Sequence, residues 1–152
     1  MKQTFLSLFL AIMLVTVVNG QDGKTFFQTF NIKEINNVEF RIPNEFTIKK
    51  WVNQTSILVE STIQLTNIPD ATYRHIMQSG RYDLTELDDE GSNLVIVAKN
   101  PERNIIRTNS GEAVESVSIT IYVPEDFELI NDTTISRKSQ SEAALPAEGL
   151  VD

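Results

Sequence analysis

RIPNEFTI (residues 41–48) and YVPEDFEL (residues 122–129) follow one pattern: an aliphatic residue, Pro, two polar or acidic residues, Phe, a polar residue and an aliphatic residue. Apolar residues also stand one, three and five positions before each proline: Ile42, Phe40 and Val38, then Val123, Ile121 and Ile119. Proline cannot donate to a strand ladder, so each copy predicts a half-buried strand that stops, turns and restarts with its Phe inward. This corner, used twice, indicates a sandwich or a short solenoid-like coil of strands.

Alternation of apolar and polar residues with period two continues over most of the chain. It predicts strands near residues 25–32, 57–65 and 116–123, and a hairpin of RYDLTEL and NLVIVA around the turn DDEGS. One stretch breaks this pattern and predicts a helix over about 68–79, capped by Asn67, with Asp70 three residues on and a stop at Gly80. The predicted fold is therefore mainly β, with an antiparallel or coiled sheet and one short helix.

The first 20 residues have the layout of a secretory signal peptide. Lys2 precedes an apolar run from Phe5 to Val18, which is followed by Asn-Gly and a polar segment. The run is shorter than a membrane-spanning helix requires, so we expect cleavage after Gly20 and no membrane span afterwards. We expect residues 21–135 to form a single β-rich domain and residues 136–152, rich in Ser, Ala and Glu, to form a flexible polar tail.

Charge and composition exclude several classes of partner and chemistry. The formal net charge is −8, which disfavours nucleic acid as a partner. The chain has no cysteine, which excludes disulfides, thiolate metal sites and cysteine nucleophiles. Its single histidine, His75, falls inside the predicted helix and lacks the partners of a catalytic triad or a zinc site. We therefore expect no catalytic residues, metal or cofactor.

An acidic run is the strongest candidate for a reactive or metal-binding site. It consists of Asp83, Glu86, Asp88, Asp89 and Glu90. A turn closed by Gly91 could gather several of these carboxylates around calcium, although the spacing differs from that of an EF-hand loop. Paired carboxylates could also hydrolyse a glycosidic bond, which makes a small secreted hydrolase the alternative function. Solvated charges around a hairpin turn are the simpler interpretation.

Aromatic residues supply a second candidate surface. Tyr122 falls on the outward parity of its predicted strand, which makes it the candidate for a surface contact. Trp51, at the end of FTIKKW, is expected to be packed in the interior.

The order of segments resembles exported bacterial proteins of the adhesin head-domain type. The resemblance rests on FFQTFNI, VEFRIPNEFTIKKW, ILVESTIQL, GRYDL and ITIYVPEDFEL, between residues 25 and 130. It implies a β-rich envelope domain and supplies no active site. This chain lacks the repeated Gly- and Asn-rich coils that follow the second corner in longer members.

These observations predict an exported, non-enzymatic binding or structural module of adhesin-like type. Its expected location is the periplasm, the cell surface or the extracellular medium. Its expected partner is an envelope protein or a glycan, and an exposed edge strand offers one mode of contact.

Overall fold

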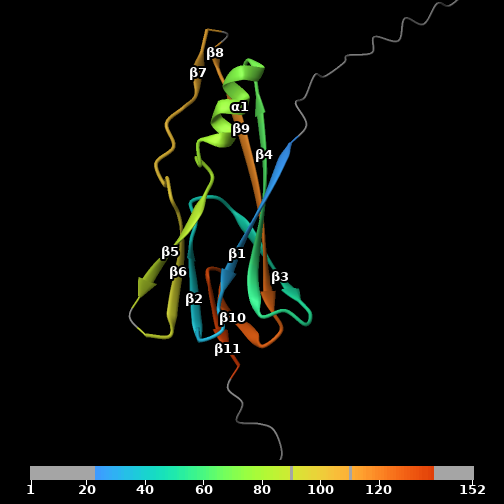
Figure 1. Cartoon of the computed structure of the whole chain (residues 1–152), viewed down its shortest axis with the longest axis vertical. Coiled ribbons are helices and arrows are strands. Elements are labelled where there is room, and N and C mark those ends of the chain that lie inside the picture. Colours follow the sequence, from blue (N-terminus) through green and yellow to red (C-terminus); the bar gives the residue numbers. More distant parts are fainter. Residues whose placement is uncertain (1–22, 90, 110, 139–152) are drawn as a thin grey trace, which may run out of the picture.

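The structure, a computed structural model, describes residues 23–89, 91–109 and 111–138. The predicted leader and most of the predicted tail lie outside these residues. The described chain is mainly β with one short helix, as predicted, and its strands form two mixed sheets and a small third ribbon (Figure 1).

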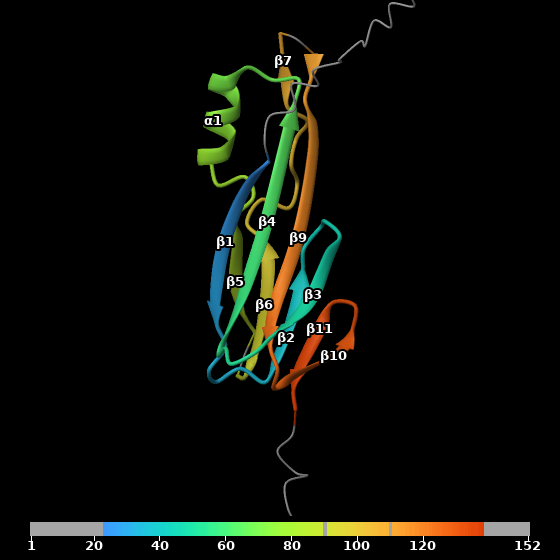
Figure 2. The same cartoon turned by 90° about the vertical axis from the view of Figure 1, so that its right-hand side faces the viewer.

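The four-stranded sheet is the longer of the two layers. Its strands, in spatial order, are β1 (Lys24–Asn31), β4 (Ser56–Thr66), β9 (Val114–Pro124) and β3 (Phe46–Trp51). β4 and β9 have 11 residues each and run side by side along the long axis (Figure 2). On both strands buried and partly exposed residues alternate, so one face of this sheet lies in the core.

The five-stranded sheet covers the lower half of that inner face. Its strands, in spatial order, are β10 (Phe127–Asn131), β11 (Thr134–Arg137), β2 (Asn37–Arg41), β6 (Asn93–Ala98) and β5 (Leu84–Asp89). Core residues from both sheets form one buried cluster, which includes Val38, Phe40, Ile121 and Phe127. The two layers therefore make a sandwich, and the solenoid-like alternative is wrong.

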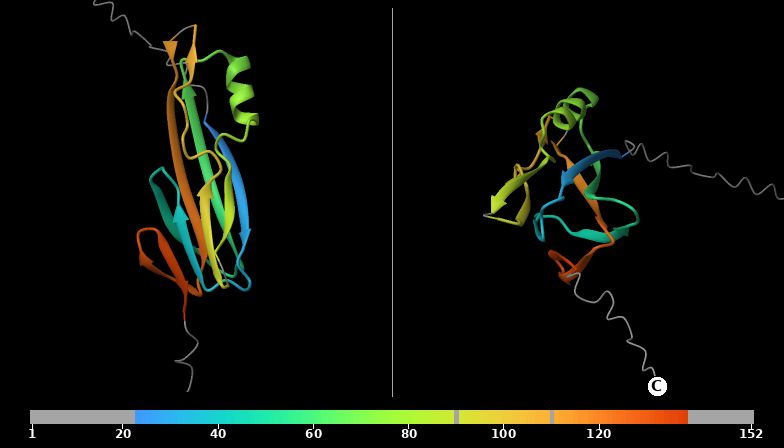
Figure 3. Two further views of the ribbon diagram at one scale, coloured as in Figure 1. Left: turned by 90° about the vertical axis from the view of Figure 1, so that its left-hand side faces the viewer. Right: turned by 60° about the horizontal axis from the view of Figure 1, so that its bottom comes forward.

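Helix α1 (Asp70–Gln78) covers the upper half of the long sheet, beyond the reach of the shorter one (Figure 3). Its buried residues Ile76 and Met77 pack against Ile63 and Leu65 of β4 in a second core cluster. A ribbon of β7 (Arg107–Thr108) and β8 (Gly111–Glu112) lies at the same end of the molecule (Figure 1).

The predicted cap of this helix is wrong, whereas its predicted stop is present. The N-cap is Pro69, no side chain caps the helix, and Asn67 has a φ of 61°. The Asn67 amide instead donates to the carbonyl of Glu112, 2.9 Å away in β8, so a distant contact replaces the local cap. Gly80 follows the last turn with a φ of 71°, a conformation that favours glycine.

The repeated corner passes the chain from one sheet to the other. The first copy connects β2 of the five-stranded sheet to β3 of the four-stranded sheet, and the second connects β9 to β10 in the opposite sense. Because each corner changes sheet, the strand that follows cannot pair with the strand before it. β3 pairs with β9, and both this pair and the β2–β6 pair are parallel, which corrects the expectation of an antiparallel sheet.

The strands that follow the two corners, β3 and β10, differ in how deeply their apolar residues are buried. Phe127 is fully buried, but Leu129, which matches Ile48 of the first copy, is 54 % exposed. β10 is the edge strand of the five-stranded sheet, so Leu129 has a neighbouring strand on one side only, and the pairing with β11 becomes irregular directly after it, between Leu129 and Asn131.

A side-chain amide connects the two sheets on one side of the sandwich. Gln28 of β1 accepts a hydrogen bond from the Leu84 backbone N–H (2.9 Å) and donates one to the Leu84 carbonyl (3.1 Å). The amide thus pairs with Leu84 as a neighbouring strand would. On the opposite side, the Lys50 ammonium of β3 donates to the carbonyl of Phe127 in β10, and burial lowers the pKa of Lys50.

We expect Gln28→Ala to lower the free energy of unfolding by about 1–3 kcal/mol, since Leu84 loses the partners of two half-buried backbone groups. Urea denaturation measures this loss. Gln64→Ala, the same change at an exposed glutamine of β4, serves as the control and is expected to cost less than about 0.5 kcal/mol. Equal losses in the two variants would show that the amide bridge is dispensable.

Candidate binding face

The outer face of the four-stranded sheet carries the aromatic residue that the sequence placed outward. Tyr122 stands between Ile121 and Val123 on β9, and both neighbours are fully buried in the core. Because successive side chains of a strand point to opposite faces, Tyr122 lies on the face away from the sandwich interior. It is half-buried by its neighbours on that face.

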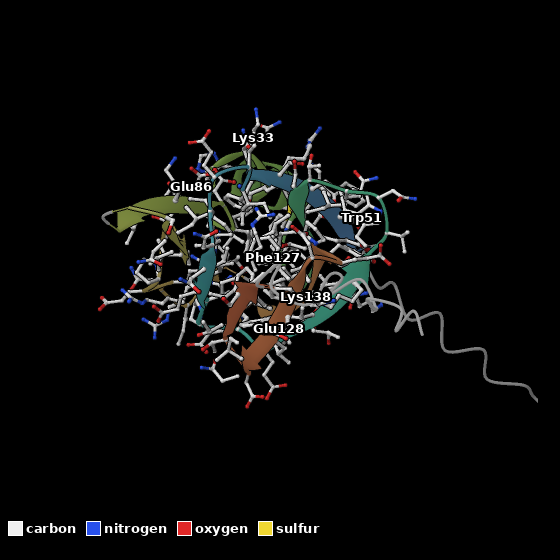
Figure 4. The ribbon with its side chains drawn as sticks, turned by 90° about the horizontal axis from the view of Figure 1, so that it is seen from below. Lys33, Trp51, Glu86, Phe127, Glu128 and Lys138 are labelled. Atoms are coloured by element: carbon white, nitrogen blue, oxygen red, sulfur yellow. The ribbon has the colours of Figure 1, made fainter. Side chains whose placement is uncertain are left out.

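Trp51 lies beside Tyr122 and not in the interior, so the prediction of buried packing is wrong. The two ring centroids are 6.2 Å apart with an interplanar angle of 61°, an edge-to-face contact. Trp51 is half-buried at the end of β3, and in the view from below it lies at the rim while Phe127 is central (Figure 4). The parallel pairing of β3 with β9 places Trp51 opposite Pro124, two positions beyond Tyr122 and on the same face.

Two charged residues flank the aromatic pair. The Tyr122 hydroxyl donates to Glu60 Oε2 of β4 at 3.0 Å, and the Lys49 ammonium lies 5.9 Å from the centre of the Tyr122 ring. The hydrogen bond to Glu60, followed by desolvation and by the negative charge of the Glu60 carboxylate, raises the pKa of Tyr122. Leu58 pairs with Tyr122 across the β4–β9 ladder. We call Lys49, Trp51, Leu58, Glu60 and Tyr122 the Tyr122 face.

Such a surface suits recognition. Aromatic rings stack on apolar faces of sugars or side chains, while the carboxylate and ammonium groups provide polar contacts beside them. Sequence periodicity located Tyr122, but Glu60 and Trp51 come from other strands and join it only through cross-strand register. No pattern within one segment could have predicted this grouping.

Three of the acidic residues, Glu86, Asp88 and Asp89, lie in the edge strand β5. The backbones of Asp88 and Asp89 pair with Leu94 and Asn93 of β6, so β5 extends two residues into the segment that the sequence predicted as the turn. Charges along an edge strand discourage its pairing with another chain.

Asp83 precedes β5, and Glu86 lies within it. Both side chains are exposed. The side chains of Asp88 and Asp89 and the whole of Glu90 lie outside what the structure describes. Calcium binding and carboxylate-dependent hydrolysis therefore stay predictions.

Within residues 23–89, 91–109 and 111–138, no group of three or more His, Asp or Glu side chains is arranged to hold a metal ion. In the same part of the chain, no helix has the length and apolarity needed to cross a membrane.

No known family, curated protein or solved structure matches this chain. The resemblance to adhesin-type head domains therefore stays a prediction, and the candidate function rests on the geometry of the Tyr122 face.

Proposed function

We propose that this protein is an exported, non-catalytic binding module of the bacterial cell envelope that contacts its partner through the Tyr122 face. The observation that carries the proposal is the outward-facing Trp51–Tyr122 pair, with its hydroxyl bound to Glu60. The two rings are half-buried on an outer sheet face, and a partner that covers them would remove their remaining apolar surface from solvent.

The predicted signal peptide supports a role outside the cytoplasm, and the acidic composition disfavours nucleic acid as a partner. The partner is an envelope protein or a glycan. Both classes bind surfaces that combine aromatic rings with polar groups, and the experiment below separates them.

The proposal predicts that Trp51→Ala and Tyr122→Ala each weaken partner binding strongly. Aromatic residues at the centre of an interface contribute about 2 kcal/mol or more, roughly a thirtyfold change in Kd. The bait is the full chain, expressed with its leader, purified after export and incubated with envelope extract from the same cells. Protease treatment of the extract abolishes capture of a protein, whereas periodate oxidation abolishes capture of a glycan.

Leu87→Ala is the matched control, because Leu87 is 48 % exposed on β5 of the other sheet. A ligand retained by Leu87→Ala but lost by both aromatic variants supports the Tyr122 face as the contact surface. Equal retention by all three variants, each checked by its urea midpoint, would overturn the assignment.

A further inference from the structure

Two arginines surround one carboxylate in the upper half of the molecule. Arg81 follows α1, Arg103 lies between β6 and β7, and Glu115 belongs to β9. Arg81 Nη2 is 2.9 Å from Glu115 Oε2, and Arg103 Nη1 is 3.3 Å from Glu115 Oε1. All three side chains are largely buried: 18 % of the Arg81 side chain, 14 % of Arg103 and 22 % of Glu115 is exposed. Each carboxylate oxygen therefore faces a different guanidinium group.

Neighbouring groups hold both guanidinium groups in place. Arg81 also donates to the carbonyl of Asn104 at 2.8 Å, and Arg103 donates to the side-chain oxygen of Asn44. The Tyr82 ring lies below both cations, 5.9 Å from Arg81 and 5.3 Å from Arg103. Five N–H donors on each guanidinium exceed the number that these contacts use. The pair is thus ordered before any ligand binds, which reduces the cost of binding.

The cluster carries more positive than negative charge. Two guanidinium groups face the single carboxylate of Glu115, although the chain as a whole is acidic. Tyr82 does not supply a second anion, because burial, assisted by the nearby Glu115 carboxylate, raises the pKa of Tyr82 to about 12. The Tyr82 hydroxyl is buried close to Arg81 and Glu115 and makes no hydrogen bond of normal geometry.

A hollow of about 330 Å³ opens beside the two arginines. Its polar lining also includes His75, Ser79 and Asn100, and this volume lies near the lower end of the range for small-molecule sites. Glu102 is the acidic residue of the lining, and its exposed charge is screened by water far more than the arginine charges are.

We propose that Arg81 and Arg103 form a binding site for an oxyanion, a carboxylate or phosphate group of an acidic ligand that enters this hollow. Planar guanidinium groups match the oxygens of both anions through paired hydrogen bonds. Glu115 already presents such a group to the pair, and in the unliganded protein it is the internal competitor for the same donors. The site is separate from the Tyr122 face, so either assignment stands without the other.

Direct titration of the purified protein tests the site. Sodium phosphate and sodium acetate are added at constant ionic strength while the side-chain Nε–H signals of the arginines are followed by NMR, with sodium chloride as the reference salt. A saturable shift of the Arg81 and Arg103 signals with phosphate or acetate, but not with chloride, supports the proposal, and the tighter of the two identifies the anion. Shifts no larger than those with chloride would overturn it.

Variants distinguish a binding site from a purely structural ion cluster. Arg103→Gln is expected to weaken anion binding about tenfold, the effect of losing one charge-assisted hydrogen bond. Arg107→Gln is the matched control, because Arg107 forms an exposed pair with Glu112 and should leave anion binding unchanged.

Glu115→Gln is the decisive change, since it removes the internal competitor and should strengthen anion binding several-fold even as it destabilises the fold. If that variant does not fold, Glu102→Gln at the exposed rim should also strengthen binding, but by less than Glu115→Gln would, because water screens the Glu102 charge. Weaker or unchanged anion binding in the folded variant would show that the cluster is structural only.

Discussion

Replacing Phe127 with alanine is expected to lower the free energy of unfolding by about 3–5 kcal/mol, the range for removing a buried aromatic side chain. Phe127 opens the second strand of the YVPEDFEL corner and is fully buried in the cluster between the sheets. The Arg137 guanidinium covers its ring at 4.6 Å, so the substitution also removes a cation–π contact. Urea denaturation followed by tryptophan fluorescence measures the loss.

Leu129→Ala provides the control on the same strand. Leu129 is 54 % exposed, so its truncation is expected to cost less than about 0.5 kcal/mol. Phe46→Ala tests the first corner, where the equivalent ring is half-buried and packs edge-to-face on Phe40 at 5.8 Å. The decrease in the free energy of unfolding for Phe46→Ala should lie between the decreases for Phe127→Ala and Leu129→Ala. A Phe127→Ala protein as stable as Leu129→Ala would refute the interpretation that the repeated Phe anchors the corner.

Period-two alternation predicted the inward residues of β2 and β9 correctly because it depends only on the pleat of each strand. Val38, Phe40, Ile121 and Val123 are all buried. The same pattern could not predict which strands pair. The parallel pairing of β3 with β9 depends on contacts between segments about 70 residues apart, and strand preference carries no information about the partner.

Local signals failed where a distant group competed for the same side chain. Asn67 is a residue type that often caps helices. Its side-chain amide instead donates a hydrogen bond to the carbonyl of Glu112 in β8, and the helix begins without a side-chain cap. For the candidate face, strand parity placed Tyr122 outward, whereas its bond to Glu60 depends on the register of β4 against β9. The pairing of Arg81 and Arg103 with Glu115 is likewise invisible in a sequence that separates them by 12 to 34 residues.

The end of the domain was also predicted too early. The loss of large apolar residues after Ile135 suggested that the ordered chain stops there, because such a segment buries little surface. β11 nevertheless continues through Arg137, with Ser136 paired to Asn37 and Arg137 paired to Phe127. At this position the hydrogen bonds of the Arg137 side chain stabilise the strand in place of apolar burial. Amino-acid composition does not reveal such bonds.

Arg137→Ala is therefore expected to lower the free energy of unfolding by about 2–3 kcal/mol. Arg137 donates to the carbonyls of Ile32 (2.8 Å) and Ile35 (3.2 Å), forms an ion pair with Asp126 and covers the Phe127 ring. Hydrogen bonds from a charged donor contribute about 1.5–3 kcal/mol each, and the 31 % exposure of the side chain reduces that sum through solvent screening. Urea denaturation gives the loss, and amide hydrogen exchange in residues 32–36 should rise with it.

Two further variants decide whether the guanidinium group, and not the mere presence of residue 137, holds this end of the sandwich. Arg137→Lys keeps the charge but lacks the planar fork that reaches two carbonyls and a carboxylate, so its stability should fall between wild type and Arg137→Ala. Lys138→Ala, one residue further along, removes an exposed side chain and keeps the backbone bond from Lys138 N–H to the Asp126 carbonyl, so it should be neutral. If Arg137→Ala proved as stable as Lys138→Ala, the chain beyond Ile135 would contribute nothing to the fold, and the domain would end where its composition indicated.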